Sequence, residues 1–382
     1  MTTGFRAVCA SIVLAALPVQ AWPVEPIKII AAFNLTGGAS VLDAPSYDGA
    51  VLAVEQINGA GGVLGRPLEL VPVDTESKPD SVATKVEAAL AASPDAVAGI
   101  GYSYSTETLP AGEVFQAHGL PFVSPGATDP AIPPEVGDFL FYAAYGDDVQ
   151  AAAMAAFARG QLKLDRVAVW VDESRDYTRT VGRDFAQSFE ALGGEIVLTE
   201  TDTGATGFGA FVNKLGSSES TAQAAYLASS PDEAPAVIGA VRAAGIAMPL
   251  LSGDGWDADT VVALSKEDAL GGIYFTTHRF LGVDTPEMKA FVAAYAARFG
   301  ADPPNAFAPL GYDTVGLLAD AIRRAQSVEP AAIRDALAAT RDYPGVVGVI
   351  GYAPGVRVPK KAVAVIAVDN GVQTLRWVAP AE

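Results

Sequence analysis

The sequence predicts an α/β protein in which parallel strands alternate with helices along nearly the whole chain. Three observations lead to this fold class. Short apolar runs rich in Val and Ile recur, longer amphipathic stretches separate them, and Gly or Pro residues mark many of the junctions. Such alternation is typical of βα units that build a parallel sheet with helices on its faces.

The first 21 residues have the pattern of a cleavable secretory signal. Arg6 supplies a basic charge, an apolar stretch extends to Leu17, and Val19-Gln20-Ala21 has the small-x-small pattern that signal peptidase cuts. The apolar stretch is too short to span a bilayer as a stable helix. We expect export and a mature chain of 382 minus 21, or 361 residues, which is enough for two domains of ordinary size.

Strands and helices then follow in order. A strand is expected where a short apolar run is bounded by turn residues, and a helix where apolar residues recur at helical spacing. The expected strands are residues 27–33, 68–73, 96–100, a short strand between Pro121 and Pro125, 166–171, 195–199, 224–228 and 249–252. The expected helices are residues 47–58, 81–91, 105–118, 148–162, 177–192, 208–215, 233–244, 286–299, 305–325 and 330–338.

The C-terminal segment predicts a β-hairpin. Two apolar runs, residues 362–368 and 372–378, flank Asp369-Asn370-Gly371, and Asn-Gly readily adopts the positive φ angles of a tight turn.

Composition excludes several classes of protein. The formal charge of −19 disfavours a basic surface for nucleic acid. Cys9 is the only cysteine and lies within the expected signal, so the mature protein is expected to have no disulfide. No paired His or Cys spacing suggests a metal site, and no cofactor is expected.

Several short motifs resemble those of the periplasmic branched-chain amino-acid-binding proteins of ABC transporters. They are Ile27-Lys28-Ile29, Leu35-Thr36-Gly37-Gly38, the segment AVLAVEQINGAGGVLG at 50–65 and Ser124-Pro125-Gly126-Ala127-Thr128. The similarity extends from Ile27 to the C-terminal hairpin, and the order and spacing of the motifs make it specific.

The resemblance implies a type I periplasmic-binding fold, with two doubly wound parallel-sheet lobes joined by about three crossovers. The N-terminal lobe would contain residues 26–145 and 277–347, and the C-terminal lobe residues 146–276 and 348–382. Ligands of open α/β sheets bind beyond the carboxyl ends of the strands, which here places the ligand between the lobes.

In the first lobe, the resemblance points to residues that bind the α-carboxylate of a ligand. Ser105 begins a helix after the strand at 96–100 and matches the family's carboxylate-binding serine. The loop with Gly126, Ala127 and Thr128 matches further contacts to the same group. Both features have structural alternatives, because Ser105 suits a helix cap and the loop suits an ordinary turn.

In the second lobe, the resemblance points to Tyr177 and Asp254. Tyr177 matches a tyrosine that closes over the ligand, and Asp254 matches the acidic residue that pairs with the ligand ammonium. Asp254 also suits a cap for a helix beginning near Trp256.

The side-chain pocket departs from the family pattern. Leu42 stands where several relatives have an aromatic residue, and Ser229 and Ser230 stand where relatives have tyrosines. Branched-chain specificity is therefore open. The residues Tyr47, Tyr102, Tyr104 and Trp256 are candidate pocket walls, with core packing as the alternative.

Enzyme functions fit less well. Residues 101–105 approach the hydrolase elbow G-x-S-x-G but lack its last glycine, and His118 is expected at the far end of the helix that Ser105 begins. A dinucleotide fingerprint at Gly99 has Tyr104 in place of its third glycine.

We therefore expect a non-enzymatic, monomeric solute-binding protein of the periplasm. It would capture one amino-acid-like ligand and deliver it to an ABC transporter permease. A ligand-sensing receptor component with the same fold is the alternative.

Overall fold

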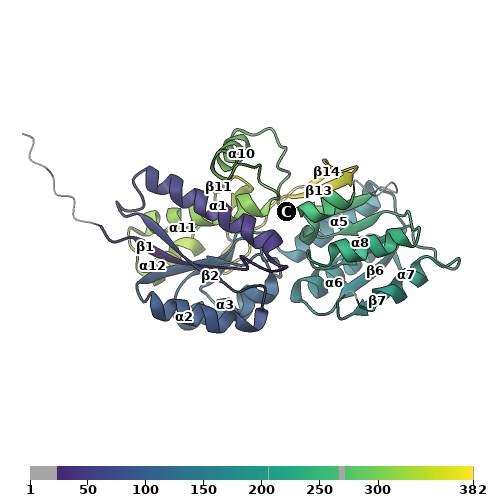
Figure 1. Ribbon diagram of the computed structural model, residues 1–382, viewed down its shortest axis with the longest axis horizontal. Helices are drawn as coiled ribbons and strands as arrows, with labels where there is room; N and C mark the ends of the chain where they lie inside the picture. The colour runs from purple at the N-terminus through teal and green to yellow at the C-terminus, as the bar shows by residue number, and fades with distance from the viewer. Residues whose placement is uncertain (1–23, 205, 266–271, 382) are drawn as a thin grey trace, which may run out of the picture.

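Two lobes lie side by side along the longest axis of the computed structural model, which describes residues 24–204, 206–265 and 272–381 (Figure 1). The expected signal over residues 1–21 lies outside the described residues. Each lobe is built on its own sheet, and we call the lobe that contains the first strand the first lobe.

The first lobe has a five-stranded sheet in the order β2-β1-β3-β4-β5. Every pairing in it is parallel. The strand order reverses between β1 and β3, as in other doubly wound sheets, and such a switch point opens a crevice at the carboxyl ends of the strands. The strands are β1 (Ile27–Phe33), β2 (Leu68–Asp74), β3 (Ala96–Gly101), β4 (Phe122–Ser124) and β5 (Leu140–Tyr142).

Helices cover both faces of this sheet, because successive strand residues point to opposite sides. Ile27 and Ile29 of β1 belong to a core with α1, α11 and α12, whereas Ile30 belongs to a core with α2, α3 and α4. The helices are α1 (Ser40–Gly59), α2 (Val82–Ala92), α3 (Ser105–Ala117), α4 (Ile132–Val136), α10 (Pro286–Phe299), α11 (Phe307–Ala325) and α12 (Pro330–Ala338), with a 3-10 turn η1 (Pro79–Ser81).

The second lobe has a seven-stranded sheet in the order β14-β13-β10-β9-β8-β6-β7. The pairings from β10 to β7 are parallel, while β13 and β14 run antiparallel at one edge. The C-terminal hairpin thus makes this sheet mixed rather than wholly parallel. The strands are β6 (Arg166–Asp172), β7 (Glu195–Asp202), β8 (Ala224–Ala228), β9 (Leu250–Ser252), β10 (Ile273–Thr277), β13 (Val363–Asp369) and β14 (Val372–Ala379).

Helices also cover both faces of the second sheet. Val167 and Val169 of β6 pack in a core with α5 and α6, and Ala168 and Trp170 pack in a core with α7, α8 and α9. The helices are α5 (Asp147–Gly160), α6 (Asp176–Ala191), α7 (Phe208–Leu215), α8 (Ala234–Ala243) and α9 (Asp259–Leu264), with a 3-10 turn η2 (Asp254–Trp256).

The chain passes between the lobes three times within the described residues. The first two passages lie between β5 and α5 and between β10 and α10. The third follows the small hairpin of β11 (Tyr343–Gly345) and β12 (Gly348–Ile350). Ile350 and Tyr352 still pack in the first lobe's core, and the Tyr352 hydroxyl donates to the Tyr142 carbonyl at 2.8 Å. The third passage therefore comes later than the expected position after residue 347.

Most expected elements are present within a few residues of their expected ends. The short elements β5, β10, β11, β12, α4 and α9 were not expected. Helix α1 begins at Ser40, although the sequence predicted its start at Tyr47, after Pro45. Proline cannot donate to the carbonyl four residues earlier. In α1 that carbonyl, of Val41, accepts a hydrogen bond from Asn305 Nδ2 at 3.2 Å instead.

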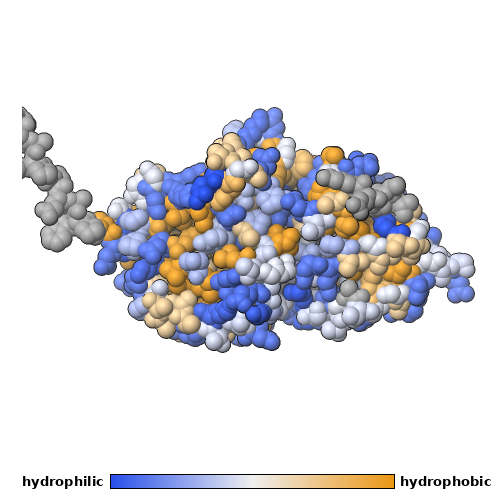
Figure 2. Space-filling model, in the orientation of Figure 1, coloured by the Kyte–Doolittle hydropathy of each residue, from blue (hydrophilic) through white to orange (hydrophobic). Residues whose placement is uncertain are grey.

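On the face shown in Figure 2, hydrophilic residues are interspersed with apolar residues over both lobes. None of the helices in the described part of the chain combines the length and apolar character needed to cross a bilayer.

Candidate functional site

A cavity of about 240 Å³ lies between the lobes. Residues of both lobes line it. The first lobe contributes Leu42, Ser103, Tyr104, Gly126, Thr128 and Phe307, and the second lobe contributes Tyr177, Pro231, Asp254 and Gly255.

Most of these residues follow the carboxyl end of a strand. Tyr104 follows β3, Thr128 follows β4, and Asp254 follows β9. The carboxyl ends of both parallel sheets therefore face one cavity, which is the arrangement expected for ligand sites in open α/β folds.

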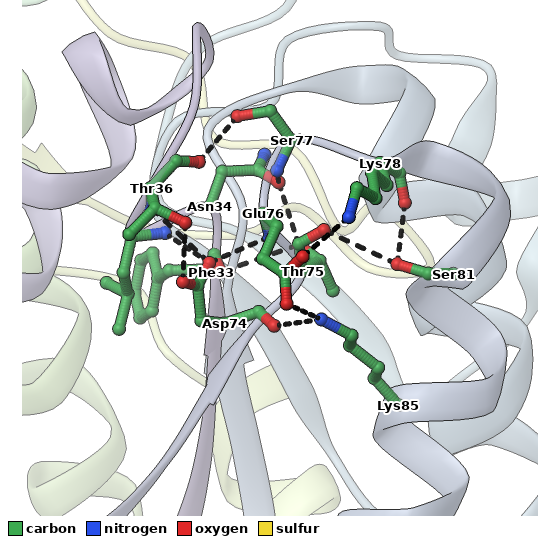
Figure 3. A network of polar contacts seen from close by, with 11 residues as sticks. Phe33, Asn34, Thr36, Asp74, Thr75, Glu76, Ser77, Lys78, Ser81 and Lys85 are labelled. Atoms are coloured by element: carbon green, nitrogen blue, oxygen red, sulfur yellow. Dashed lines mark hydrogen bonds and ion pairs between the residues drawn. The ribbon is translucent and has the colours of Figure 1, made fainter.

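Beside the first lobe's part of the cavity, a polar network holds the loops after β1 and β2 (Figure 3). The carboxylate of Asp74 accepts the backbone N–H of Leu35 at 3.0 Å through Oδ1 and the hydroxyl of Thr36 at 2.7 Å through Oδ2. The side-chain oxygen of Asn34 accepts the Thr75 hydroxyl at 2.7 Å and the Ser77 N–H at 3.1 Å. These bonds fix the segment that leads into α1.

Asp43 in α1 connects this network to the cavity. Its Oδ2 accepts the backbone N–H and side-chain N–H of Asn34 at 2.9 and 3.0 Å, and its Oδ1 accepts the N–H of Ser103 at 2.7 Å. Since Ser103 lines the cavity, a buried carboxylate sets the position of this wall.

Ser105 is buried but does not line the cavity. Its hydroxyl accepts the N–H groups of Thr128 and Asp129 at 3.4 and 3.2 Å. The N-cap residue of α3 is Tyr104, and it makes no side-chain cap. Ser105 therefore holds the neighbouring loop instead of capping its own helix.

The loop from Gly126 to Thr128 contributes two of its three residues to the cavity. Gly126 and Thr128 line it, whereas Ala127 is buried and donates its N–H to the Ser124 hydroxyl at 3.1 Å. A Cβ atom on Gly126 would lie 2.7 Å from the Phe307 ring, so glycine is required here by close packing of the cavity wall.

Asp254 lines the cavity from the second lobe and has two side-chain partners. Its Oδ1 accepts Gln150 Nε2 at 2.8 Å, and its Oδ2 lies 2.8 Å from His278 Nε2. The N-cap of η2 is Gly253, and that of α9 is Ala258, neither with a side-chain cap. Asp254 thus bonds across the fold and does not cap a helix.

Tyr177 closes the cavity from the start of α6. Its hydroxyl accepts the backbone N–H of Gly255 at 3.0 Å, which ties α6 to the turn that carries Asp254. Burial, reinforced by the charge of Asp254, raises the pKa of Tyr177 well above its ordinary value of 10.0. The hydroxyl therefore stays protonated at neutral pH and retains a proton that it can donate.

Of the candidate pocket walls, the structure brings only Tyr104 to the cavity. Tyr102 is buried in the core of the first lobe. Trp256 is buried in the core of the second lobe and donates its Nε1–H to the Ser229 hydroxyl at 2.9 Å. Tyr47 packs edge-on against Phe33.

The structure also shows where the residues that depart from the family pattern lie. Leu42 lines the cavity, as the position of its aromatic counterpart in relatives would suggest. The Ser229 hydroxyl accepts the Nε1–H of Trp256. The backbone carbonyl of Ser230 accepts the backbone N–H of Ala234 at the start of α8. Pro231, the next residue, reaches the cavity in place of these serines.

Hydrogen bonds join the lobes beside the cavity, among them the bond from the Ala306 N–H to Asp257 Oδ2 at 3.1 Å and two that involve α6. The N–H of Asp176 donates to the Thr106 hydroxyl at 3.3 Å, and the Thr180 hydroxyl donates to Asp129 Oδ2 at 3.1 Å. Both link α6 of the second lobe to loops and helices of the first. The described structure is therefore a closed arrangement.

The arrangement does not resemble a serine hydrolase site. His118 Nε2 lies 2.9 Å from Glu87 Oε2 near the surface, and His278 bonds to Asp254. The hydroxyl of Ser105 is bonded to backbone N–H groups. Among the described residues, no group of three or more His, Cys, Asp or Glu side chains is placed to hold a metal ion.

Sequence reasoning missed Gln150, His278, Phe307 and Pro231. Gln150 and Asp254 are 104 positions apart, so no local pattern relates them. Phe307 lies within the helix expected over residues 305–325, and nothing in its local sequence distinguishes it from a core residue. His278 lies at a passage between the lobes, one residue after β10, but an isolated histidine carries no local signal of its partner.

Comparisons with known proteins agree with this geometry. The periplasmic binding protein family matches residues 26–373. A leucine-, isoleucine-, valine-, threonine- and alanine-binding protein of Pseudomonas aeruginosa is 26% identical over 334 residues, which cover 86% of this chain and 87% of the relative. An amino acid binding protein of the same organism is 28% identical and covers 78% of each chain.

Solved structures show the same likeness. The substrate-binding protein of a branched-chain amino acid transporter from Streptococcus pneumoniae, in complex with isoleucine, has a TM-score of 0.84 and 27% identity. The comparison covers 93% of this chain and 99% of that one. A leucine binding protein from Thermotoga maritima has a TM-score of 0.82 and 28% identity, with the same coverage.

Proposed function

Because this chain belongs to the periplasmic binding protein family, we propose that it captures one small amino-acid-like ligand between its lobes and delivers it to an ABC transporter permease. The observation that carries this proposal is a small cavity that both lobes line, with a loop of the first lobe facing an acidic residue of the second.

The two walls suit the two ends of an amino acid. Thr128 and the backbone at Gly126 line the first-lobe wall next to the start of α3, and the N-terminus of a helix favours an anionic group. Asp254 lines the opposite wall and can accept charge-assisted hydrogen bonds from an ammonium. In this proposal Ser105 acts by holding the carboxylate-binding loop.

The remaining wall is mainly apolar. Leu42, Phe307 and Pro231 supply it, together with the rings of Tyr104 and Tyr177. This favours an apolar ligand side chain.

The relatives support the rest of the proposal. Their names describe amino-acid-binding and transporter substrate-binding proteins rather than enzymes. Accordingly, we propose that this protein acts in the periplasm after removal of residues 1–21, as a monomer, and that it releases its ligand unchanged to a permease. No cofactor takes part in this function.

A ligand screen tests the proposal. Purified protein, freed of endogenous ligand by partial unfolding and refolding, is melted with each of the common amino acids, and with benzoate as an acid without an amine. We expect one or a few amino acids to raise the melting temperature, since ligands that bind only the folded state stabilise it. Stabilisation by benzoate alone would refute the amino-acid assignment.

A turnover control completes the experiment. The stabilising amino acid is incubated with the protein and recovered, and its amount and identity are measured. We expect full recovery. Conversion of the amino acid into a product would contradict a transport role.

A further inference from the structure

The carboxylate of Asp254 is held on the side away from the cavity by two residues that do not line it. Gln150 of α5 donates its Nε2–H to Oδ1 at 2.8 Å. His278, which follows β10 at a passage between lobes, contacts Oδ2 at 2.8 Å. All three side chains are almost fully buried, with Asp254 2% exposed and the other two at 0% and 1%.

Gln150 has every hydrogen-bonding position of its amide occupied. Nε2 donates to Asp147 Oδ1 at 2.7 Å and to Asp254 Oδ1, while Oε1 accepts the Asp254 N–H at 3.0 Å and the Thr276 hydroxyl. Carboxylates accept and backbone N–H groups donate, so only one orientation of the amide satisfies these contacts. Gln150 therefore fixes both the backbone and the carboxylate of Asp254.

The contact with Asp254 also determines where His278 carries a proton. A carboxylate oxygen only accepts, so Nε2 is the protonated ring nitrogen. Nδ1 is buried and has no hydrogen-bond partner in the described structure. A second proton on Nδ1 would add an unpaired buried donor, which disfavours the imidazolium form.

The environment of His278 shifts the pKa of its imidazole in both directions. Tyr145 stacks on the imidazole with ring centres 4.1 Å apart, and Phe307 contacts its edge. Burial lowers the pKa of His278 below its ordinary 6.5, Asp254 opposes this shift, and the charge of Lys361 adds to it.

Burial raises the pKa of two nearby acids, Asp147 and Asp257, the latter from 3.8 to about 6. Burial, with the neighbouring charge of Asp254, raises the pKa of Asp147 well above 3.8, so this group is neutral over a wider range. The carboxylate of Asp257, three residues after Asp254, accepts a hydrogen bond from the Thr277 hydroxyl at 2.6 Å. Arg279 follows His278 in the chain and opposes charge on Lys361.

We propose that Gln150 and His278 are positioning residues that orient the Asp254 carboxylate, and that a second proton on His278 decides whether this carboxylate offers its full negative charge to a ligand ammonium. This inference rests on the proposed binding of an amine. With neutral His278, Asp254 keeps one uncompensated charge. With protonated His278, the two form a neutral pair, and the attraction for an ammonium falls.

Ligand binding and protonation of His278 are thermodynamically linked. If ammonium binding favours neutral His278, then protonation of His278 weakens ligand binding by the same factor. Affinity should fall on acidification by at most about tenfold per pH unit, the limit for one proton. An amino-acid ligand does not change its own charge between pH 5 and about 8, so this dependence would come from the protein.

The first test measures the proton directly. The sequence contains only two histidines, His118 and His278, so protein with ¹³C-labelled histidine gives two resolvable imidazole titrations, assigned with His118→Gln. We expect the His278 midpoint to lie below 6.5 and to fall further in Asp254→Asn, because Asp254 favours the imidazolium. An unchanged midpoint in Asp254→Asn would overturn the proposed coupling.

The second test measures binding against pH. Isothermal calorimetry with L-leucine, L-alanine and L-phenylalanine is run from pH 5 to 8 on wild type, His278→Gln and the control His118→Gln. Glutamine places an amide donor near the Nε2 position but does not titrate. We expect His278→Gln to lose the acid-side fall in affinity, while His118→Gln keeps it. An unchanged pH profile in His278→Gln would overturn the inference.

The same data separate the two proposals. If neither these three nor any amino acid of the melting screen binds wild type at any pH, amine capture by Asp254 is refuted and the proposed function fails with it. If they bind but the variants follow the wild-type profile, only the role of His278 is refuted.

Gln150 is tested through Gln150→Met, an apolar replacement of similar length. Loss of a hydrogen bond to a charged group predicts affinity about 10- to 100-fold weaker at pH 7. Gln150→Glu, whose protonated carboxyl has one O–H and can donate to Asp254 but not also to Asp147, should come closer to wild-type affinity measured at the same pH as the pH falls from 7. A purely structural role would lower the melting temperature of both variants without this pH-dependent recovery.

Discussion

Single residues around the cavity act mainly through contacts that are distant in sequence. Ser105 and Asp254 both had helix capping as a structural alternative, and neither caps a helix. Ser105 bonds to the loop at Thr128, and Asp254 bonds to Gln150 and His278. Each therefore contributes to the shape of the cavity wall.

Asp254→Asn is predicted to separate charge from shape. Asparagine keeps the size of the side chain and one acceptor for Gln150, and the imidazole of His278 can change tautomer to accept from the new amide. Affinity for an amino acid should fall by about 30- to 5,000-fold, because removal of one partner of a buried charged pair costs ~2–5 kcal/mol. Calorimetry measures this loss, and the melting temperature without ligand should fall only modestly, because the changed tautomer leaves the buried Nδ1–H without an acceptor.

The control is Asp302→Asn, which removes one charge from an exposed position outside the cavity. It should leave affinity unaltered. Wild-type affinity in Asp254→Asn would remove Asp254 from the proposed ammonium site, together with the main reason to require an amine on the ligand.

At the scale of elements, the packing of α1 against α11 places Leu42 and Phe307 in the same wall of the cavity. The two helices approach so closely that a Cβ atom on Gly49 would lie 1.9 Å from the Ala308 carbonyl oxygen. Asn305, just before α11, also supplies the hydrogen bond that Pro45 cannot make in α1. This crossing thus depends on both helices.

Gly49→Ala is predicted to destabilise the protein. The added methyl group would force the helices apart, and overpacking of this kind typically costs ~1–3 kcal/mol. Urea unfolding measures the free energy of unfolding. The matched control is Gly59→Ala at the end of the same helix, where an added Cβ meets no atom within 4 Å. Equal effects of the two substitutions would contradict the close crossing.

At the scale of the whole molecule, the lobes meet through few polar contacts beside the cavity, which suits a hinge that opens and closes. The Thr180 hydroxyl bonds to Asp129 across this boundary at 3.1 Å. A contact that exists only when the lobes are closed stabilises the ligand-bound state relative to the open state.

Thr180→Val is therefore predicted to weaken ligand binding with little effect on ligand-free stability. Loss of one neutral hydrogen bond, about 0.5–1.5 kcal/mol, corresponds to an affinity roughly 2- to 12-fold lower. Calorimetry measures affinity, and small-angle scattering should show a smaller radius of gyration on ligand binding in wild type. The control is Thr374→Val, an exposed position on β14. Identical scattering with and without saturating ligand would argue against closure.

A buried lysine at the passages between lobes makes a second prediction at this scale. Lys361 donates to the Ala143 carbonyl at 3.1 Å, and burial lowers its pKa from 10.5 to about 8. Between these values the unfolded chain binds more protons than the folded protein, so this group makes stability rise with pH from about 8 to 10.5. Below pH 8 its charge is a cost to the folded state.

Lys361→Met should remove this contribution. Relative to wild type, the variant should gain stability as the pH falls from 10.5 to 8, by at most ~3.4 kcal/mol, and the difference in free energy of unfolding should be constant below pH 8. Chemical unfolding at several pH values measures it. A difference that stays constant between pH 8 and 10.5 as well would show that Lys361 is charged in the folded protein.

Local sequence patterns determined the order and identity of most helices and strands. The ends of β8, α7, α10 and α12 agree with expectation to the residue, because apolar spacing and flanking turn residues report directly on local structure. The strand β10 escaped prediction because a short apolar run becomes a strand only through its neighbours, here β9 and β13. The motifs likewise indicated Thr128, Tyr177 and Asp254 without showing their surroundings.

The tertiary structure alone decided which side chains meet. Tyr104 reaches the cavity while Tyr102 and Trp256 lie in the cores, although all three are aromatic residues near the ends of strands. Gln150 and His278 contact Asp254 from 104 and 24 positions away. Periodicity specifies which face of an element is buried, but a hydrogen bond between distant elements depends on how the sheets, helices and lobes pack together.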